Sequence, residues 1–172
     1  ERRGHVLVAA LARPPVNAID AALLARLDAA VTEAEADPAI SLLHVRSTQK
    51  AFCAGADLAL MRASMASPDG AETMLGVVRD MQRVFARIAA APFVTLAEIG
   101  GAALGGGLEL ALACDLRVAA AEAMVGLPEV RLGLLPAAGG TQRLTALCGA
   151  GVARRLILGG ETVDGGEALR LG

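Results

Sequence analysis

Two glutamates and the glycines near them are the residues of this sequence that could carry out proton chemistry. Glu109 follows the run Gly105-Gly106-Gly107 in the first turn of an apolar segment, and Glu129 follows Pro128 on a short segment that looks exposed. Two carboxyl groups in a mostly apolar pocket can be held in different protonation states, so that one accepts a proton and the other donates one. A structural interpretation stays open, in which Glu109 complements a helix N-terminus and Glu129 is a solvated surface acid.

Three segments, 51–57, 100–107 and 126–141, are each predicted to be a strand that ends in a turn with glycine. Glycine adopts backbone angles that other residues avoid, and it lets a ligand approach the main chain closely. The amides of Gly105 to Gly107 precede an apolar helix, so they are expected at the positive end of its dipole, where an anion or a polarised carbonyl oxygen binds. The alternative is a turn that only permits tight packing of helix against strand.

Three common loop motifs are excluded by the sequence itself. A Walker A loop requires Lys and then Ser or Thr after its last glycine, whereas Gly106 is followed by Gly107-Leu108. A dinucleotide fingerprint that starts at Gly105 would require glycine or alanine at position 110, which is Leu110. None of the serines stands in a Gly-x-Ser-x-Gly elbow, so a nucleophilic serine of that kind is excluded.

The elements that would position these residues alternate between strand and helix. Strands are predicted at residues 5–11, 40–45 and 93–99. One helix is capped by Asp20 and stopped by Asp37-Pro38, and a second ends at Ala91-Pro92. Their apolar positions recur at helical spacing, at Leu23, Leu24, Leu27 and Val31 in the first and at Met74, Val77, Val78, Met81, Phe85 and Ile88 in the second. This alternation predicts an α/β fold.

Composition restricts the class of protein. A length of 172 residues favours a single domain spanning residues 1–172. A net charge of −2 and 2% aromatic residues argue against nucleic-acid binding. Residues 93–113, the most apolar stretch, contain Glu98, Glu109 and five glycines, so no membrane span is expected, and no signal peptide is recognised at the N-terminus.

The cysteines and histidines predict neither a disulfide framework nor a metal site. Cys53, Cys114 and Cys148 are odd in number and far apart, which favours a reducing, cytoplasmic location. His5 and His44 lack metal-ligand spacing and lie in apolar alternating runs, so both are interpreted as structural.

Taken together, the glycine-rich segments resemble the crotonase (enoyl-CoA hydratase/isomerase) superfamily in order and spacing. Residues 51–58 (AFCAGADL) are similar to the first oxyanion-hole loop of that family, and residues 100–111 (GGAALGGGLELA) to the second. Residues 127–129 (LPE) and 135–144 (LPAAGGTQRL) resemble the segment that carries its second acid, and Arg13-Pro14 with Asn17-Ala18 resembles its N-terminal strand signature. The resemblance extends along the chain from Val6 onward.

The resemblance implies a crotonase (ClpP-like) spiral of ββα units that usually forms homotrimers or dimers of trimers and binds acyl-CoA thioesters. It places the thioester oxygen between the amides of Ala56 and Gly106, and it makes Glu109 and Glu129 the catalytic acid–base pair, with Glu129 delivering the proton to C2. Main chain near Ala54, Asp57 and Leu58 would contact the CoA end. Neither a metal nor a redox cofactor is implied, because CoA is part of the substrate.

The predicted activity is hydration of a 2-enoyl-CoA to a 3-hydroxyacyl-CoA in fatty-acid or related acyl-CoA breakdown. The alternatives are an isomerase or another acyl-CoA lyase or hydrolase of the same superfamily, and a non-catalytic acyl-CoA-binding protein.

Some residues depart from the family pattern. Ala137 stands where the family's Pro-Gly-x-Gly-Gly motif has glycine, so the placement of water could differ. Leu127 replaces a residue that is often polar, which predicts a more apolar pocket wall. The sequence ends at Gly172, where relatives continue with C-terminal helices, so a C-terminal helical part is expected to be missing.

Overall fold

The strands form two sheets through which the chain passes in turn. The computed structural model describes residues 1–172, apart from the side chain of Met65. The larger sheet has the order β1-β2-β3-β4-β6, made of Arg2–Arg3, Val6–Leu11, Leu42–Ser47, Val94–Ile99 and Leu116–Ala119. The smaller sheet has the order β5-β7-β8, made of Ala103–Leu104, Val125–Gly126 and Thr162–Val163.

The pairing of these strands produces a spiral of strand–strand–helix units. Strands β2, β3, β4 and β6 are parallel, with Val8 beside His44 and His44 beside Leu96. After β4 the chain enters the smaller sheet as β5 and continues into helix α4, and after β6 it enters as β7. The segment after β3 also joins the smaller sheet, through a single bridge between Cys53 and Ala103 of β5. The predicted ββα spiral is therefore confirmed.

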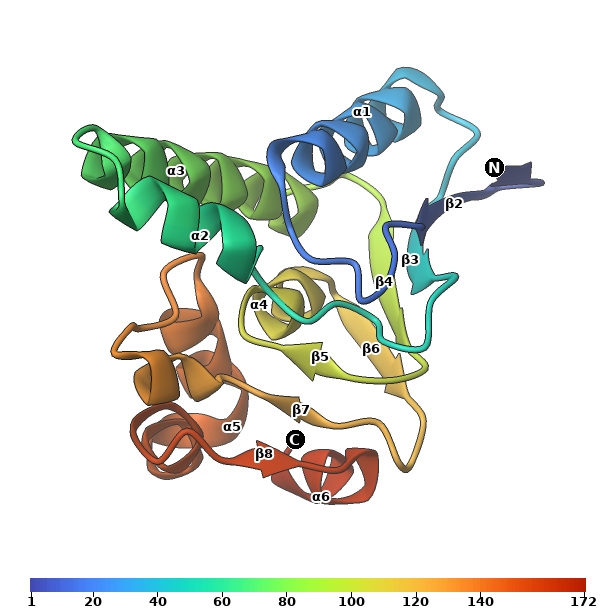
Figure 1. Cartoon of the computed structure of the whole chain (residues 1–172). Helices are drawn as coiled ribbons and strands as arrows, with labels where there is room; N and C mark the ends of the chain where they lie inside the picture. The colour runs from blue at the N-terminus through green and yellow to red at the C-terminus, as the bar shows by residue number, and fades with distance from the viewer.

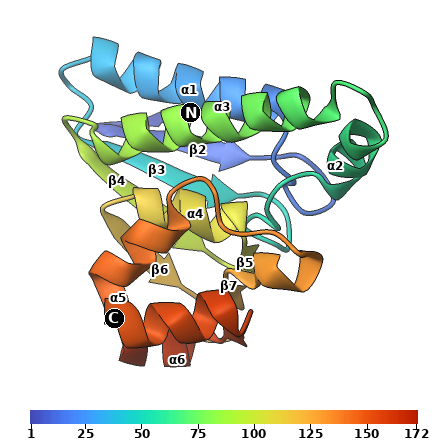
Figure 2. The same cartoon turned by 90° about the vertical axis from the view of Figure 1, so that its left-hand side faces the viewer.

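The helices cover the sheets in layers (Figures 1 and 2). Helices α1 (Ala21–Ala36) and α3 (Gly70–Ala89) lie side by side over one face of the larger sheet, and α2 (Leu58–Met65) packs against α3. Helix α4 (Gly106–Ala113) lies at the centre, in contact with β4, α3 and α5 (Gly140–Leu158). A 3₁₀ helix, η1 (Pro128–Leu132), precedes α5, and α6 (Gly165–Leu171) follows β8. Every residue of α4 is buried, so its first turn, which carries Glu109, is firmly placed.

The apolar core lies between the larger sheet and α1, α3 and α4. Its fully buried large side chains include Phe52, Phe85, Leu43 and Leu110. Among the described residues, no helix is long and apolar enough to cross a membrane.

Most of the predicted elements are present, with ends that differ by a few residues. Asp20 caps α1 by accepting a hydrogen bond from the Leu23 amide at 2.7 Å, as expected. One expectation is wrong, and one helix was not expected. Residues 51–57 form isolated bridges at Cys53 and Ala56 rather than a strand, because the chain there turns between neighbouring segments. Helix α2 was not predicted, although Asp57 caps it by accepting hydrogen bonds from the Ala59 and Leu60 amides.

Candidate active site

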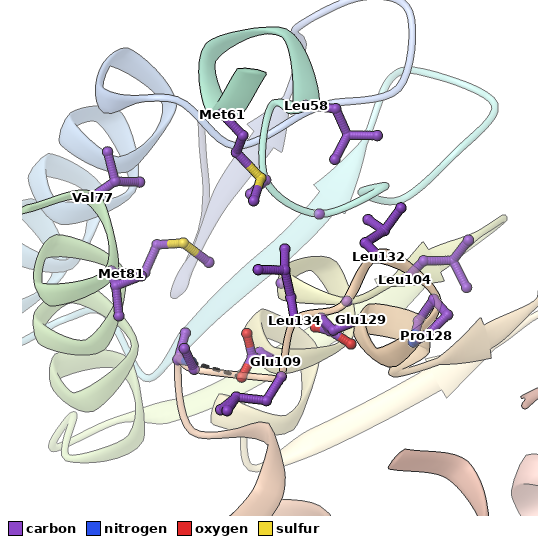
Figure 3. A pocket seen from close by; sticks show the side chains of 18 of the residues that line it. Leu58, Met61, Val77, Met81, Leu104, Glu109, Pro128, Glu129, Leu132 and Leu134 are labelled. Atoms are coloured by element: carbon purple, nitrogen blue, oxygen red, sulfur yellow. Dashed lines mark hydrogen bonds between the residues drawn. The ribbon is translucent and has the colours of Figure 1, made fainter. Parts of the chain in front are cut away.

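A cavity of about 260 Å³ lies between α2, α3, the start of α4 and η1. Figure 3 shows Met61 and Met81 on one side of it and the two glutamates, Glu109 and Glu129, on the other. Its lining is otherwise apolar: Ala54, Gly55, Ala56, Leu58, Met74, Val77, Val78, Leu104, Gly105, Gly106, Pro128, Leu132, Leu134, Leu135, Ala137 and Ala138. The predicted residues Ala54, Ala56, Leu58, Gly106, Glu109 and Glu129 thus come together from three separate segments, whereas Asp57 is not part of the lining.

The amide of Ala56 faces this cavity because the peptide before it is fixed. The carbonyl oxygen of Gly55 accepts a hydrogen bond from the Ile19 amide at 2.8 Å. In a planar trans peptide the N–H points opposite to the C=O, so the Ala56 N–H is directed away from Ile19. Within the described part of the chain the Ala56 amide has no hydrogen-bond acceptor.

The amide of Gly106 is fixed in the same way at the first residue of α4. The Gly105 carbonyl accepts the first bond of the helix, from the Glu109 amide at 3.0 Å, so the Gly106 N–H points out of the helix N-terminus. A Cβ on Gly106 would lie 3.7 Å from the Ala56 nitrogen, which places the two amides close together. Among the described residues the Gly106 amide also lacks an acceptor, so two free N–H donors meet at one wall of the cavity.

Two glycines with left-handed backbone angles allow this approach. Gly55 has φ +93° and Gly105 has φ +54°. A Cβ on Gly55 would lie 2.9 Å from the Leu104 oxygen and 3.3 Å from the Gly106 nitrogen. A side chain at either position would strain the backbone, and at Gly55 it would also push the two amides apart.

Glu109 is buried and its carboxylate is held by the main chain. Only 2% of the residue is exposed, and Oε1 accepts hydrogen bonds from the amides of Ala138 and Gly140, both at 2.8 Å. Burial raises the pKa of Glu109, and the two amides and the positive charge of Arg143 oppose that rise. The donors stabilise the ionised form, so Glu109 is suited to accept a proton.

Glu129, on η1, lies beside Glu109 and has far fewer hydrogen-bond partners (Figure 3). Its Oε2 is buried and has no hydrogen-bond partner among the described residues. Burial raises the pKa of Glu129 to about 7, and the neighbouring Glu109 charge adds to the rise. The segment is exposed, as expected, since η1 has no buried residue, but the Glu129 side chain lines the cavity, which does not fit the alternative of a solvated surface acid. When the pair holds one proton, Glu129 is therefore the carboxyl that carries it.

Of the residues predicted near the CoA end, two line the cavity and the third, Asp57, stabilises the surrounding structure. Ala54 and Leu58 line the cavity, and Leu58 is 49% exposed at its mouth. The Asp57 side chain caps α2 by accepting hydrogen bonds from the Ala59 and Leu60 amides at 2.9 and 3.2 Å. It also pairs with the Arg13 guanidinium, whose hydrogen bond lowers the pKa of Asp57. Its side chain is thus committed to the scaffold.

Sequence reasoning missed several features of the site. Met81 of α3 lines the cavity, but its apolar spacing in the sequence equally indicates an ordinary core. The amides that hold Glu109 come from residues 138–140, where the Gly139-Gly140 pair was the available signal. A Cβ on Gly140 would lie 2.9 Å from Glu109 Cγ, so only glycine fits there.

One departure from the family pattern has a different consequence from the one expected. Leu127 is fully buried and is not among the residues that line the cavity, so it does not make the wall more apolar. Its side chain points into the core, where it lies 3.1 Å from the Cβ position of Gly140.

The histidines have protein partners in the structure. His5 Nδ1 lies 2.8 Å from the Ala39 oxygen, and His44 Nε2 lies 2.8 Å from Glu98 Oε2. Across the described residues, His, Cys, Asp and Glu side chains form no group of three or more that could hold a metal ion.

Comparison with known proteins gives one consistent answer. The family model described as enoyl-CoA hydratase/isomerase matches residues 1–172. The crotonyl-CoA hydratase of Syntrophomonas wolfei is 40% identical over 174 residues, and the match covers 100% of this chain and 65% of that protein. The mitochondrial methylglutaconyl-CoA hydratase of Mus musculus is 41% identical over 176 residues, covering 100% of this chain and 54% of the relative.

Solved structures agree with the sequence matches. The crystal structure of an enoyl-CoA hydratase from Bacillus anthracis superimposes with a TM-score of 0.91 at 34% identity, covering 100% of this chain and 66% of that one. The chain thus spans a little under two thirds of the length of the curated relatives that it matches.

Proposed function

Because the chain belongs to the enoyl-CoA hydratase/isomerase family, we propose that it adds water across the 2,3 double bond of an enoyl-CoA thioester. The observation that carries the proposal is the pairing of two free amides with the buried Glu109 and the half-buried Glu129 around one apolar cavity. Water addition uses both carboxyl groups, one to accept a proton and one to donate a proton.

The amides of Ala56 and Gly106 are proposed to bind the thioester carbonyl oxygen. Attack at C3 moves electrons from the double bond toward that oxygen, so negative charge develops there in the transition state. Two preorganised N–H donors stabilise the charge more strongly than the neutral ground state, and losing one such donor typically costs on the order of 10²–10³ in rate. The N-terminus of α4 adds the positive end of its dipole.

The two glutamates are proposed to exchange the protons of the added water. Ionised Glu109 accepts a proton from the water as its oxygen bonds to C3, and protonated Glu129 delivers a proton to C2. The pair starts and ends with one proton, so nothing but water is consumed. The main-chain donors on Glu109 and the lone, buried Glu129 Oε2 support this division of roles.

The lining favours an acyl group without a second charge. Its polar side chains are the two glutamates, and none of its described residues is Lys, Arg or His. A second carboxylate on the acyl chain, as in the compound for which the mouse relative is named, would lie near these acids without a cation to pair with. The proposed substrates are therefore 2-enoyl-CoA esters with an uncharged, apolar acyl chain.

Several predictions from the sequence accompany this proposal without a direct test. The CoA moiety is placed along Ala54, Asp57 and Leu58, where Leu58 flanks the mouth of the cavity. A homotrimer or dimer of trimers, a cytoplasmic location, the absence of a metal or redox cofactor and a single domain over residues 1–172 all stay predictions.

The test is to mix the complete protein with crotonyl-CoA, follow the loss of enoyl-thioester absorbance and identify the product by mass. Gain of one water with CoA still attached supports hydration. A parallel assay with a 3-enoyl-CoA detects isomerisation, and release of free CoA would indicate a hydrolase. Binding of crotonyl-CoA without any turnover would contradict the proposal and favour the acyl-CoA-binding alternative.

A further inference from the structure

The loop that carries the Ala56 amide is held by one short segment of the chain, residues 13–20, here called the anchor segment. Three main-chain hydrogen bonds join the two: Ala54 N to Val16 O at 3.0 Å, Ile19 N to Gly55 O at 2.8 Å and Asp57 N to Ile19 O at 3.2 Å. The second of these fixes the peptide whose N–H is that of Ala56. The direction of this amide therefore depends on the placement of the anchor segment.

Asn17 fixes the middle of the anchor segment from the inside. It is fully buried, and it adopts a left-handed backbone angle, φ +51°. Its Oδ1 accepts a hydrogen bond from the Arg13 amide at 2.7 Å, and its Nδ2 donates to Phe52 O at 2.9 Å and Ser47 Oγ at 2.7 Å. Asn17 thus joins the anchor segment both to the strand β3 and to the loop before Ala56.

The Arg13 side chain links the end of the anchor segment, at Asp20, to Asp57 in the loop that follows Ala56. Its guanidinium lies 2.8 Å from Asp20 Oδ2 and 2.6 Å from Asp57 Oδ2, and it donates to Ala18 O at 3.0 Å. Asp20 is the N-cap of α1 and Asp57 is the N-cap of α2. One half-buried side chain therefore ties together the starts of two helices, and Ala56 is the residue immediately before the second cap.

We propose that Arg13 and Asn17 are positioning residues that aim the Ala56 amide at the substrate carbonyl. Neither side chain lines the cavity, so both act through the main chain that they hold, above all the Gly55–Ala56 peptide. The inference rests on the proposed role of that amide in binding the thioester oxygen. Displacing a catalytic donor by about 1 Å can cost as much as 100-fold in rate, so small rearrangements of the anchor segment are enough.

The decisive variant is Arg13→Gln, compared with Arg87→Gln as a matched control. Arg87 also bridges two carboxylates, Asp28 and Glu35, and its side chain is 30% exposed against 29% for Arg13. It joins α1 to α3 and does not line the cavity. Both changes remove a guanidinium that links two elements, but only the Arg13 guanidinium is connected to the loop that carries Ala56.

Two readouts separate positioning from general stability. The first is kcat and KM with crotonyl-CoA. The second is the red shift in absorbance of a bound cinnamoyl-CoA ester, which reports polarisation of the thioester carbonyl without turnover. Arg13→Gln should lower kcat by about tenfold or more, change KM by less than about twofold and reduce the red shift. Arg13→Lys should restore part of both signals, and Arg87→Gln should leave them unchanged.

Other results would overturn the proposal. A full red shift and unchanged kcat in Arg13→Gln would do so, as would equal losses in Arg13→Gln and Arg87→Gln. If Arg13→Gln does not fold, Asn17→Gly keeps the left-handed backbone while removing the side chain, and the same signals decide. If the wild-type protein does not hydrate crotonyl-CoA but shows a red shift that Arg13→Gln loses, the positioning role stands and hydration fails.

Discussion

Replacing Glu129 by glutamine should make the folded protein more stable at pH 8 while abolishing most of its activity. Burial raises the pKa of Glu129 from an ordinary 4.5 to about 7, so the folded state holds this proton more tightly than the unfolded state does. As pH rises from 4.5 to 7, the unfolded chain releases the proton first, and the free energy of unfolding falls across that window. Below pH 4.5 Glu129 is protonated in both states and has no such effect.

The size of the effect follows from the same shift. A difference of 2.5 units, 7 minus 4.5, corresponds to at most about 3 kcal/mol. Because Glu129 is only partly buried, solvent screening reduces this, and we expect about 1–2 kcal/mol at pH 8. Glutamine keeps the shape of a protonated carboxyl and stays neutral, so Glu129→Gln should gain this amount relative to the wild type at pH 8 and little at pH 4. Its kcat should fall by roughly 10²-fold or more.

The assay is denaturant unfolding of wild type and Glu129→Gln at pH 4, 6 and 8, combined with crotonyl-CoA turnover. Glu122→Gln, which changes an exposed glutamate, is the control and should show no pH-dependent difference. A stability difference that is independent of pH, or a loss of stability at pH 8, would refute the buried-proton reasoning. Nearly unchanged turnover would refute the catalytic role.

The other predictions concern the partner acid, the amide wall and the substrate. Glu109→Gln should lower kcat by roughly 10²-fold in steady-state hydration assays, because glutamine cannot accept a proton; a similar loss in 3-enoyl-CoA isomerisation would argue against a one-acid mechanism. Gly55→Ala should reduce kcat about 100-fold, since φ is +93° and Leu104 O is 2.9 Å from the new Cβ, whereas Gly76→Ala in α3, with open space around it, should leave turnover intact. Crotonyl-CoA should have at least tenfold higher kcat/KM than methylglutaconyl-CoA, and equal values would contradict the uncharged-acyl proposal.

The sequence determined the kind of fold and the identity of the chemical groups. Alternating strand and helix patterns predicted α1, α3 and the strands β2, β3 and β4 correctly, because apolar periodicity and caps such as Asp20 act locally. The order and spacing of the glycine segments indicated the family, and Glu109 and Glu129 were identified as the acids. Helix α2 was not predicted from local patterns, although Asp57 caps it; with eight residues it is too short to be stable alone in water, and it packs against α3.

Only the tertiary structure decided how these groups differ in chemistry. Glu109 and Glu129 are the same residue type, yet one carboxylate meets the amides of Ala138 and Gly140 and the other is buried almost alone. The direction of the Ala56 amide likewise depends on a hydrogen bond from Ile19, 37 positions earlier in the chain (56 minus 19). Protonation and amide direction are set by burial and by partners brought from distant segments, and these exist only once the chain has folded.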